Sequence, residues 1–289
     1  MVRQQKRNGR GKSLGCRWIR KPPVIVIGMH RSGTGLVTQL LESIGIFMGA
    51  IQQGDHESVY HLRMNERVLS VAGIKWDIQG RTTRLHPDCR ILRKFKNSIQ
   101  YRLQEFVYYW AGINWVRFVL ARILGNKKGW GWKDPRNMLT LPCWLELFPN
   151  AKVIHVVRNG VDVADSLKKR EERRIHSRRN WHHHSTRCLS LDGGFHLWEE
   201  YVSIGMSYEK NPLINTHRVE FETLLGNVDQ VIESLSEFLK VKPNSRKVDK
   251  FVKGIKKSRK NAWIENQDLR VFFNKVKNTR WMQEMGYDE

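Results

Sequence analysis

The chain has 289 residues, which is enough for one sizeable hydrophobic core and for at most two domains. Apolar residues make up 40% of it and include 11 tryptophans, so the composition excludes an intrinsically disordered chain. Lysine and arginine outnumber aspartate and glutamate by 51 to 28, and the net charge of +23 favours anionic partners such as a nucleotide, a polyanion or an acidic membrane surface.

Residues 1–21 are rich in lysine, arginine and glycine and are predicted to form a flexible basic arm, whereas residues 22–289 are predicted to form one α/β domain. Neither an apolar signal core nor a run of about 18 apolar residues occurs, so no secretory signal and no transmembrane helix are expected. The four cysteines are scattered without metal-ligand spacing, and reduced thiols are the simplest interpretation. We therefore expect a cytoplasmic protein, although a chain that had lost a membrane anchor would look the same.

The first predicted unit is a strand, a glycine loop and a helix. Val24–Ile27 is a short apolar run typical of a buried strand, and it ends at Gly28. Apolar residues recur at helical spacing from Leu36 and stop at Gly45. The loop before a helix binds anions, because unpaired backbone N–H groups and the helix dipole both favour negative charge. The unit therefore predicts a phosphate or a chemically similar ligand.

The glycines of this loop have the spacing of a nucleotide-binding P-loop, whose pattern is G-x-x-x-x-G-K-[ST]. Gly28 and Gly33 fit the pattern, but Thr34 stands where the lysine belongs. The missing lysine weakens the interpretation as an ATP-binding loop, while Arg31 and Ser32 supply other donors for an anion. For the loop taken alone, an ordinary packing turn between strand and helix is the alternative.

The next hundred residues are less regular. Residues 51–97 are polar and irregular with short helical patches. In chain order, the patterns then predict a helical patch at His61–Val71, an amphipathic helix at Ser98–Leu124, a short strand at Trp130–Trp132 that runs into Lys133, and a helix at Met138–Leu147.

A second strand-helix unit begins at Val153. Val153–Val157 is predicted to be a buried strand with Arg158 at its carboxyl end, and Ser166 lies about two turns into the helix that follows. Ligands of open α/β sheets gather at the carboxyl ends of the strands. Arg158 is therefore expected to face the same crevice as the loop after Gly28.

Residues 171–193 break the pattern and are predicted to form a basic loop or lid. Consecutive histidines do not share a face, so His182–His184 are interpreted as solvated and not as metal ligands. Asn215–Phe221 is predicted to be a strand and Glu222–Leu239 a helix, and the segment 242–289 is basic and mixed. The alternation of short strands and helices predicts a three-layer α/β fold that contains a P-loop, with a mostly parallel central sheet and helices on both faces.

Five segments together resemble the landmarks of one family in their order and spacing. They are His30-Arg-Ser-Gly-Thr-Gly35, Gly131-Trp-Lys-Asp-Pro-Arg136, Val157-Arg-Asn-Gly-Val-Asp-Val-Ala-Asp-Ser166, Phe195–Tyr201 and Val219–Leu225. The family is the P-loop sulfotransferases of the bacterial or carbohydrate-directed type, whose sulfuryl donor is 3′-phosphoadenosine 5′-phosphosulfate (PAPS). The first segment resembles the 5′-phosphosulfate loop, with Arg31 where many members have lysine, and the third resembles the 3′-phosphate element. The last segment departs from the family in having Phe221 in place of tyrosine.

The resemblance implies PAPS as donor, 3′-phosphoadenosine 5′-phosphate (PAP) as product and no metal. The residues that it assigns to donor binding are His30, Arg31, Ser32, Gly33, Thr34, Gly35, Arg158 and Ser166. Trp198 is one candidate for an aromatic slot around the adenine.

Sulfuryl transfer needs cations for the donor and leaving phosphate, and a base for the acceptor hydroxyl. Arg31 is the first candidate for the leaving-group cation, and Lys133 is the second. In family members that resemble this chain, a glutamate some two dozen residues after the loop often serves as the base, which implies Glu57. His56 and Glu66 remain alternatives for the base.

The expected function is therefore transfer of a sulfuryl group to a hydroxyl acceptor, with an anionic glycan suggested by the basic segment and the overall charge. A P-loop nucleotide kinase or hydrolase is one alternative, which the missing lysine disfavours. A basic nucleic-acid-binding protein is another, and without a recognition motif only nonspecific binding would be expected.

Overall fold

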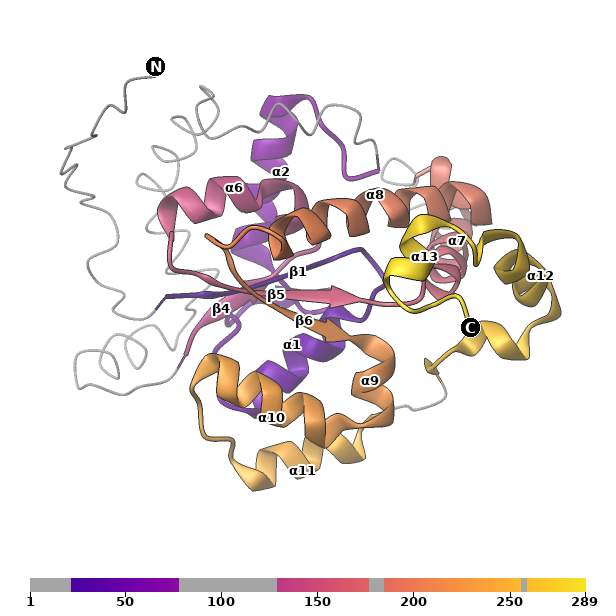
Figure 1. Ribbon diagram of the computed structural model, residues 1–289. Coiled ribbons are helices and arrows are strands. Elements are labelled where there is room, and N and C mark those ends of the chain that lie inside the picture. Colours follow the sequence, from indigo (N-terminus) through magenta and orange to yellow (C-terminus); the bar gives the residue numbers. More distant parts are fainter. Residues whose placement is uncertain (1–21, 78–128, 177–184, 256–258) are drawn as a thin grey trace, which may run out of the picture.

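The computed structural model describes residues 22–77, 129–176, 185–255 and 259–289 (Figure 1). The predicted basic arm, the candidate helix Ser98–Leu124 and the histidines 182–184 lie outside the described residues. The centre of the structure is a parallel sheet of four strands in the order β4-β1-β5-β6. These strands are β4 (Gly131–Lys133), β1 (Val24–Gly28), β5 (Lys152–Val157) and β6 (Asn215–Glu220).

Helices cover both faces of this sheet, as Figure 1 shows for α6 and α8 on one face and α1 and α10 on the other. The first face carries α2 (Val59–Ala72), α6 (Asn137–Leu147), α7 (Gly160–His176), α8 (Leu191–Glu209) and α12 (Gln267–Val276). The second face carries α1 (Thr34–Ser43), α9 (Phe221–Gly226), α10 (Val228–Leu239) and α11 (Ser245–Lys253). The remaining elements are the short strands β2 (Gln52–Gln53) and β3 (Glu57–Ser58), the 3₁₀ turns η5 (Arg187–Leu189) and η7 (Ala262–Glu265), and α13 (Arg280–Glu284). The predicted three-layer α/β fold is confirmed.

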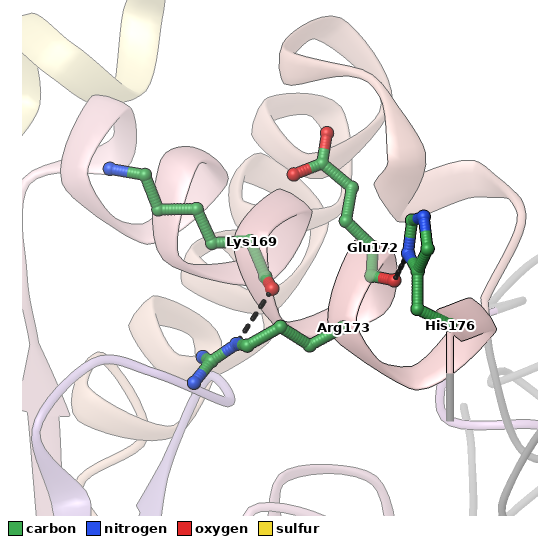
Figure 2. A pocket seen from close by; sticks show the side chains of 4 residues that line it. All are labelled: Lys169, Glu172, Arg173 and His176. Atoms are coloured by element: carbon green, nitrogen blue, oxygen red, sulfur yellow. Dashed lines mark hydrogen bonds between the residues drawn. The ribbon is translucent and has the colours of Figure 1, made fainter.

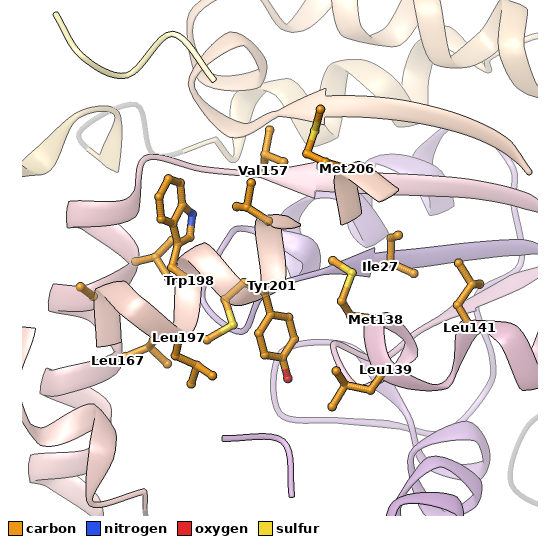
Figure 3. Close-up of a cluster of buried hydrophobic side chains, with 14 of the residues drawn as sticks. Ile27, Met138, Leu139, Leu141, Val157, Leu167, Leu197, Trp198, Tyr201 and Met206 are labelled. Carbon is orange, nitrogen blue, oxygen red and sulfur yellow. The ribbon is translucent and has the colours of Figure 1, made fainter. Parts of the chain in front are cut away.

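The central strand β1 feeds two hydrophobic cores because successive side chains point to opposite faces of a sheet. Ile25 and Ile27 belong to the cluster under α6, α7 and α8, whereas Val24 and Val26 belong to the cluster under α1 and α10. Figure 3 shows part of the first cluster, in which Tyr201 of α8 is drawn between Trp198 of the same helix and Met138 of α6. A strand that is buried on both faces explains the unbroken apolar run in the sequence.

The strand order places the loops that follow three strands at one edge of the sheet. The chain leaves β1 for β4 on one side and returns to β5 on the other side of β1. The carboxyl end of β1 is therefore a switch point of the topology, where open α/β sheets bind ligands. The loop after Gly28, the residues from Lys133 onward and Arg158 all lie at this edge.

One strand position links β5 to α8 and β6 through a buried histidine. The ring of His155 lies against Gly205 of α8, where a Cβ atom would approach it to 2.3 Å. Its Nδ1 donates to Glu209 at 2.5 Å, and the guanidinium of Arg218 donates to the same carboxylate. Burial would raise the pKa of Glu209, but these hydrogen bonds lower it to about 2.

Two predictions about secondary structure are wrong. The basic loop expected over residues 171–193 is wrong at its two ends, where α7 continues to His176 and α8 starts at Leu191, whereas residues 177–184 lie outside the described residues. Ion pairs between residues four apart, such as Asp165 with Lys169, support α7 despite its many charges. The single helix expected over 222–239 is two helices, because the Asn227 side chain caps a new helix by accepting from the N–H of Gln230.

Candidate active site

The loop after β1 owes its shape to residues in the left-handed backbone region. Arg31 has φ of 71° and Gly33, at the start of α1, has φ of 91°. A Cβ atom on Gly33 would lie 2.2 Å from the ring of Phe221, so only glycine fits between the loop and α9. The side chain of Ser32 is buried and donates to the carbonyl of Met29 at 2.7 Å. The loop thus opens onto the N-terminus of α1, whose first N–H groups have no partner within the helix.

Arg158 forms the second wall at the carboxyl end of β5. Its guanidinium is buried, lies 4.5 Å from the ring centre of Phe221 and makes an ion pair of 3.3 Å with Asp162. Its two terminal nitrogens donate to the carbonyls of Arg31 and Arg259, at 3.3 and 3.1 Å. Its Nε is buried and, within the described residues, has no hydrogen-bond partner. A buried donor without a partner is costly, and it suits an anionic ligand.

The Arg31 side chain links the two predicted donor elements. Its Nε donates to Ser166 of α7 at 2.9 Å, and another of its nitrogens pairs with Asp55 at 2.7 Å. Arg31 and Ser166 are 135 positions apart in the sequence. The tertiary structure therefore joins the glycine loop to the second turn of α7, as the predicted crevice requires.

A cavity of about 310 Å³ lies between these walls. This is the lower end of the volumes typical of small-ligand sites. Its lining residues are Arg31, Gly33, Thr34, Gly35, Leu36, Gln39, Gly54, Asp55, His56, Arg158, Phe221, Leu225, Gly254 and Arg259. The cavity therefore brings the glycine loop and the guanidinium of Arg158 to one space.

Glu57 and Lys133 lie together beside this cavity. The Nζ of Lys133 is buried, donates to the carbonyl of Asp55 at 2.8 Å and lies 3.4 Å from a Glu57 oxygen. Arg136 approaches the other Glu57 oxygen to 3.7 Å. Burial disfavours the charged form of both groups. It raises the pKa of Glu57, although Lys133 and Arg136 oppose the shift, and it lowers the pKa of Lys133. A carboxylate with a raised pKa beside cations has the properties of a general base.

The other two candidates for the base have different surroundings. Both ring nitrogens of His56 are engaged, because Nε2 lies 2.8 Å from the amide nitrogen of Gln39 and Nδ1 lies 3.0 Å from the amide oxygen of Gln52. Glu66 is exposed and pairs with Arg136 at 3.3 Å. Of the three candidates, Glu57 has the environment best suited to accept a proton.

Two residues predicted for the donor site, His30 and Trp198, make their contacts outside the cavity lining. The ring of His30 lies edge-on against Trp76, with 4.7 Å between the ring centres, and His30 is not among the residues that line the cavity. Trp198 is 1% exposed and donates its indole N–H to the carbonyl of Arg158. Trp198 therefore supports Arg158 from the core and does not form an open slot for adenine.

The sequence did not indicate several of the residues that line the cavity. Asp55 and Gln39 carried no recognisable motif, and Phe221 was noted only as a departure from the family pattern. Gly254 and Arg259 belong to a segment interpreted only as basic and mixed. The run Lys253-Gly-Ile-Lys-Lys-Ser-Arg-Lys260, which sets a glycine among basic residues, was the available signal.

A second hollow, of about 660 Å³, lies on the outer surface of α7 (Figure 2). Its lining within the described residues consists of Lys169, Glu172, Arg173 and His176. Arg173 and His176 donate to carbonyls of their own helix, at 3.0 and 2.7 Å. Because these side chains serve the helix and do not converge on one point, we assign no site to this hollow.

The fold and the site together define a P-loop-type α/β protein with an anion cradle that lacks the lysine of ATP-binding loops. The sequence profile of the sulfotransferase family matches residues 22–244, and the chain belongs to this family. An uncharacterized protein of Aquifex aeolicus (strain VF5) is 24% identical over 224 residues, which are 75% of this chain and 25% of that protein. The chain thus matches about a quarter of the length of this relative.

Two solved structures are similar at low sequence identity. The sulfotransferase domain from the curacin biosynthetic pathway is 14% identical with a TM-score of 0.48, and the match covers 90% of this chain and 99% of that domain. The sulfotransferase from Alicyclobacillus acidocaldarius is also 14% identical, with a TM-score of 0.47, and the match covers 87% and 100% of the two chains. In the described part of the present chain, no helix is long and apolar enough to cross a membrane.

Proposed function

We propose that the protein transfers a sulfuryl group from PAPS to a hydroxyl acceptor. The observation that carries this proposal is the pairing of two anion positions in one cavity of about 310 Å³. One position is the glycine cradle at the start of α1, and the other is the buried Arg158 with its unpartnered Nε. PAPS carries a 5′-phosphosulfate and a 3′-phosphate and so presents an anionic group to each.

At the donor, Arg31 would stabilise the negative charge that develops on the leaving phosphate as the sulfur–oxygen bond breaks. Its present bond to Ser166 holds the guanidinium at the boundary between the two anion positions. Arg158 and Ser166 would bind the 3′-phosphate, and the backbone from Ser32 to Gly35 would bind the 5′ group. Phe221 and Leu225 supply the apolar part of the cavity, which suits the adenosine.

At the acceptor, Glu57 would remove the proton from the attacking hydroxyl. Its carboxylate is held by Lys133 at 3.4 Å and by Arg136 at 3.7 Å, so its position is fixed before the acceptor arrives. Lys133 would also stabilise charge on the sulfuryl oxygens in transit. Burial raises the pKa of Glu57 toward neutral pH, and a general base works best when its pKa lies near the working pH.

The acceptor that we propose is an anionic glycan. The net charge of +23 favours anionic partners in general. The basic residues of α7 begin at Lys168, two positions after Ser166, and thus continue directly from the donor site. Transfer to a sugar hydroxyl needs only the groups described above.

Calorimetry with PAP and with ATP-Mg tests the donor. The proposal expects PAP to bind tightly and ATP-Mg weakly, because Thr34 replaces the lysine that a nucleoside triphosphate requires. Binding of ATP-Mg without binding of PAP would overturn it in favour of a nucleotide kinase or hydrolase. Turnover of labelled PAPS against a panel of glycan hydroxyls then tests the reaction itself.

A further inference from the structure

Helix α7 carries three functional residues at intervals of four, which places them on one face of the helix. Ser166 contacts Arg31 in the donor site. One turn further on, Arg170 is largely buried and donates its Nε to Glu171 at 2.6 Å, and Arg174 shares the same Glu171 oxygen at 3.3 Å. Both arginines therefore reach the same oxygen of Glu171, one to two turns from Ser166.

Trp76 brings Arg170 and His30 together. The guanidinium of Arg170 lies 4.8 Å from the centre of the Trp76 ring, and the ring of His30 meets the same tryptophan edge-on. His30 directly precedes Arg31 in the loop after β1. A residue of the loop and a residue of α7 therefore converge on one side chain, and none of the three lines the donor cavity.

Both converging residues hold a buried polar atom that lacks a hydrogen bond. Within the described part of the chain, neither Nε2 of His30 nor Nη2 of Arg170 has a partner. His30 is 8% exposed, and its ring lies edge-on against Trp76. Leaving buried donors unpaired is costly, so two of them around one side chain suit a ligand that accepts hydrogen bonds.

The charges around His30 indicate the sign of this ligand. Burial, followed by the nearby Arg170, Arg136, Lys133 and Arg174, lowers the pKa of His30, which keeps the imidazole neutral. A neutral imidazole can donate one N–H without adding charge, while the surrounding cations attract an anion. Two of these cations, Lys133 and Arg136, also contact Glu57, so His30 and the cations around it lie beside Glu57, the proposed base.

We propose that His30 and Arg170, positioned by Trp76, form an acceptor subsite that binds a carboxylate or sulfate group next to the hydroxyl to be sulfated. This inference rests on the proposed function, because it assigns the acceptor side of the same site. It makes His30 and Arg170 specificity-determining residues that select an anionic saccharide, such as a uronate or an already sulfated sugar, over a neutral one.

Histidine-labelled NMR of the PAP-saturated protein tests the subsite, with inorganic sulfate as the first probe. Sulfate is expected to shift the His30 ring signals saturably, and the signals missing from His30→Phe identify them. Arg170→Met should weaken this binding roughly 10-fold or more, since it removes a charged hydrogen-bond donor. Lys169→Met removes the same charge from the preceding, exposed position and should leave the binding within about twofold.

The second probe is a matched pair of sugars. Methyl β-glucuronide should shift the His30 signals, while methyl β-glucoside, which lacks only the carboxylate, should not. Equal effects of the two sugars, equal effects of Arg170→Met and Lys169→Met, or His30 signals that do not respond to sulfate would each overturn the subsite. Should Arg170→Met fail to fold, His30→Phe keeps the ring against Trp76 and must lose glucuronide binding in calorimetry. PAP binding by the wild-type protein distinguishes failure of the proposed function from failure of the subsite. No PAP binding would refute the proposed function. PAP binding without a response of His30 to the probes would refute the subsite alone.

Discussion

Replacing Arg158 by alanine should weaken PAP binding through the 3′-phosphate specifically. The Arg158 guanidinium is buried and lines the cavity, and its Nε has no hydrogen-bond partner within the described residues. Hydrogen bonds to charged groups contribute about 1.5–3 kcal/mol, so the loss corresponds to roughly a 10- to 150-fold higher Kd. Calorimetry gives this Kd directly.

A double comparison isolates the phosphate contact from general damage to the site. Adenosine 5′-phosphate lacks only the 3′-phosphate, so Arg158→Ala should change its Kd much less than that of PAP. Arg158 also holds the carbonyls of Arg31 and Arg259, and thermal unfolding must show that the variant remains folded. Arg280→Ala, which removes an exposed arginine paired with Glu284, should change neither Kd. Equal weakening of both nucleotides by Arg158→Ala would refute the assignment of this arginine to the 3′-phosphate.

Three further changes test the site and the fold. Glu57→Gln should leave the Kd of PAP unchanged but lower kcat by roughly 100- to 10,000-fold, and full turnover of the variant would remove Glu57 as the base. Wild-type turnover should fall as the pH drops through the raised pKa of Glu57, because only the carboxylate accepts a proton. Gly33→Ala should destabilise the protein by about 1–3 kcal/mol in thermal unfolding, since φ is 91° and the added methyl would meet a buried ring, and an unchanged Tm would contradict this packing. Glu209→Gln should cost about 1–2 kcal/mol at neutral pH after allowance for solvent screening. The folded-state pKa of Glu209 is lowered to about 2, so the stability that its carboxylate contributes is present above the unfolded-state pKa and is lost as the pH falls toward 2. A loss of stability in Glu209→Gln that did not shrink in acid would therefore contradict the ion pair.

The sequence predicted the elements whose patterns are local. The apolar runs of β1 and β5 and the glycines around Arg31 were recognisable because burial on both faces and left-handed backbone leave direct marks on residue choice. Charge patterns were less informative. The basic residues after 170 indicated a loop, but α7 continues to His176 because ion pairs and the burial of Glu171 support the helix.

Partners from distant segments could not be predicted in the same way. Nothing in the sequence indicates that Phe221 packs against Gly33, or that Arg158 donates to the carbonyl of Arg259. The proposed base illustrates the same limit. Glu57 was named by analogy, whereas its contact with Lys133 arises because β3 packs beside the end of β4.

By itself, the sequence determined the strand-loop-helix unit, the α/β class and the anionic character of the ligand, because each depends on short-range periodicity, glycine placement or net charge. Only the tertiary structure decided which side chains share a site. The order β4-β1-β5-β6 sets the ends of three strands side by side and turns Arg31, Lys133 and Arg158 into neighbours. The same packing places His30 and Arg170 against Trp76, and neither of them lines the donor cavity. Proximity in space depends on strand order and helix packing, and these are properties of the whole chain.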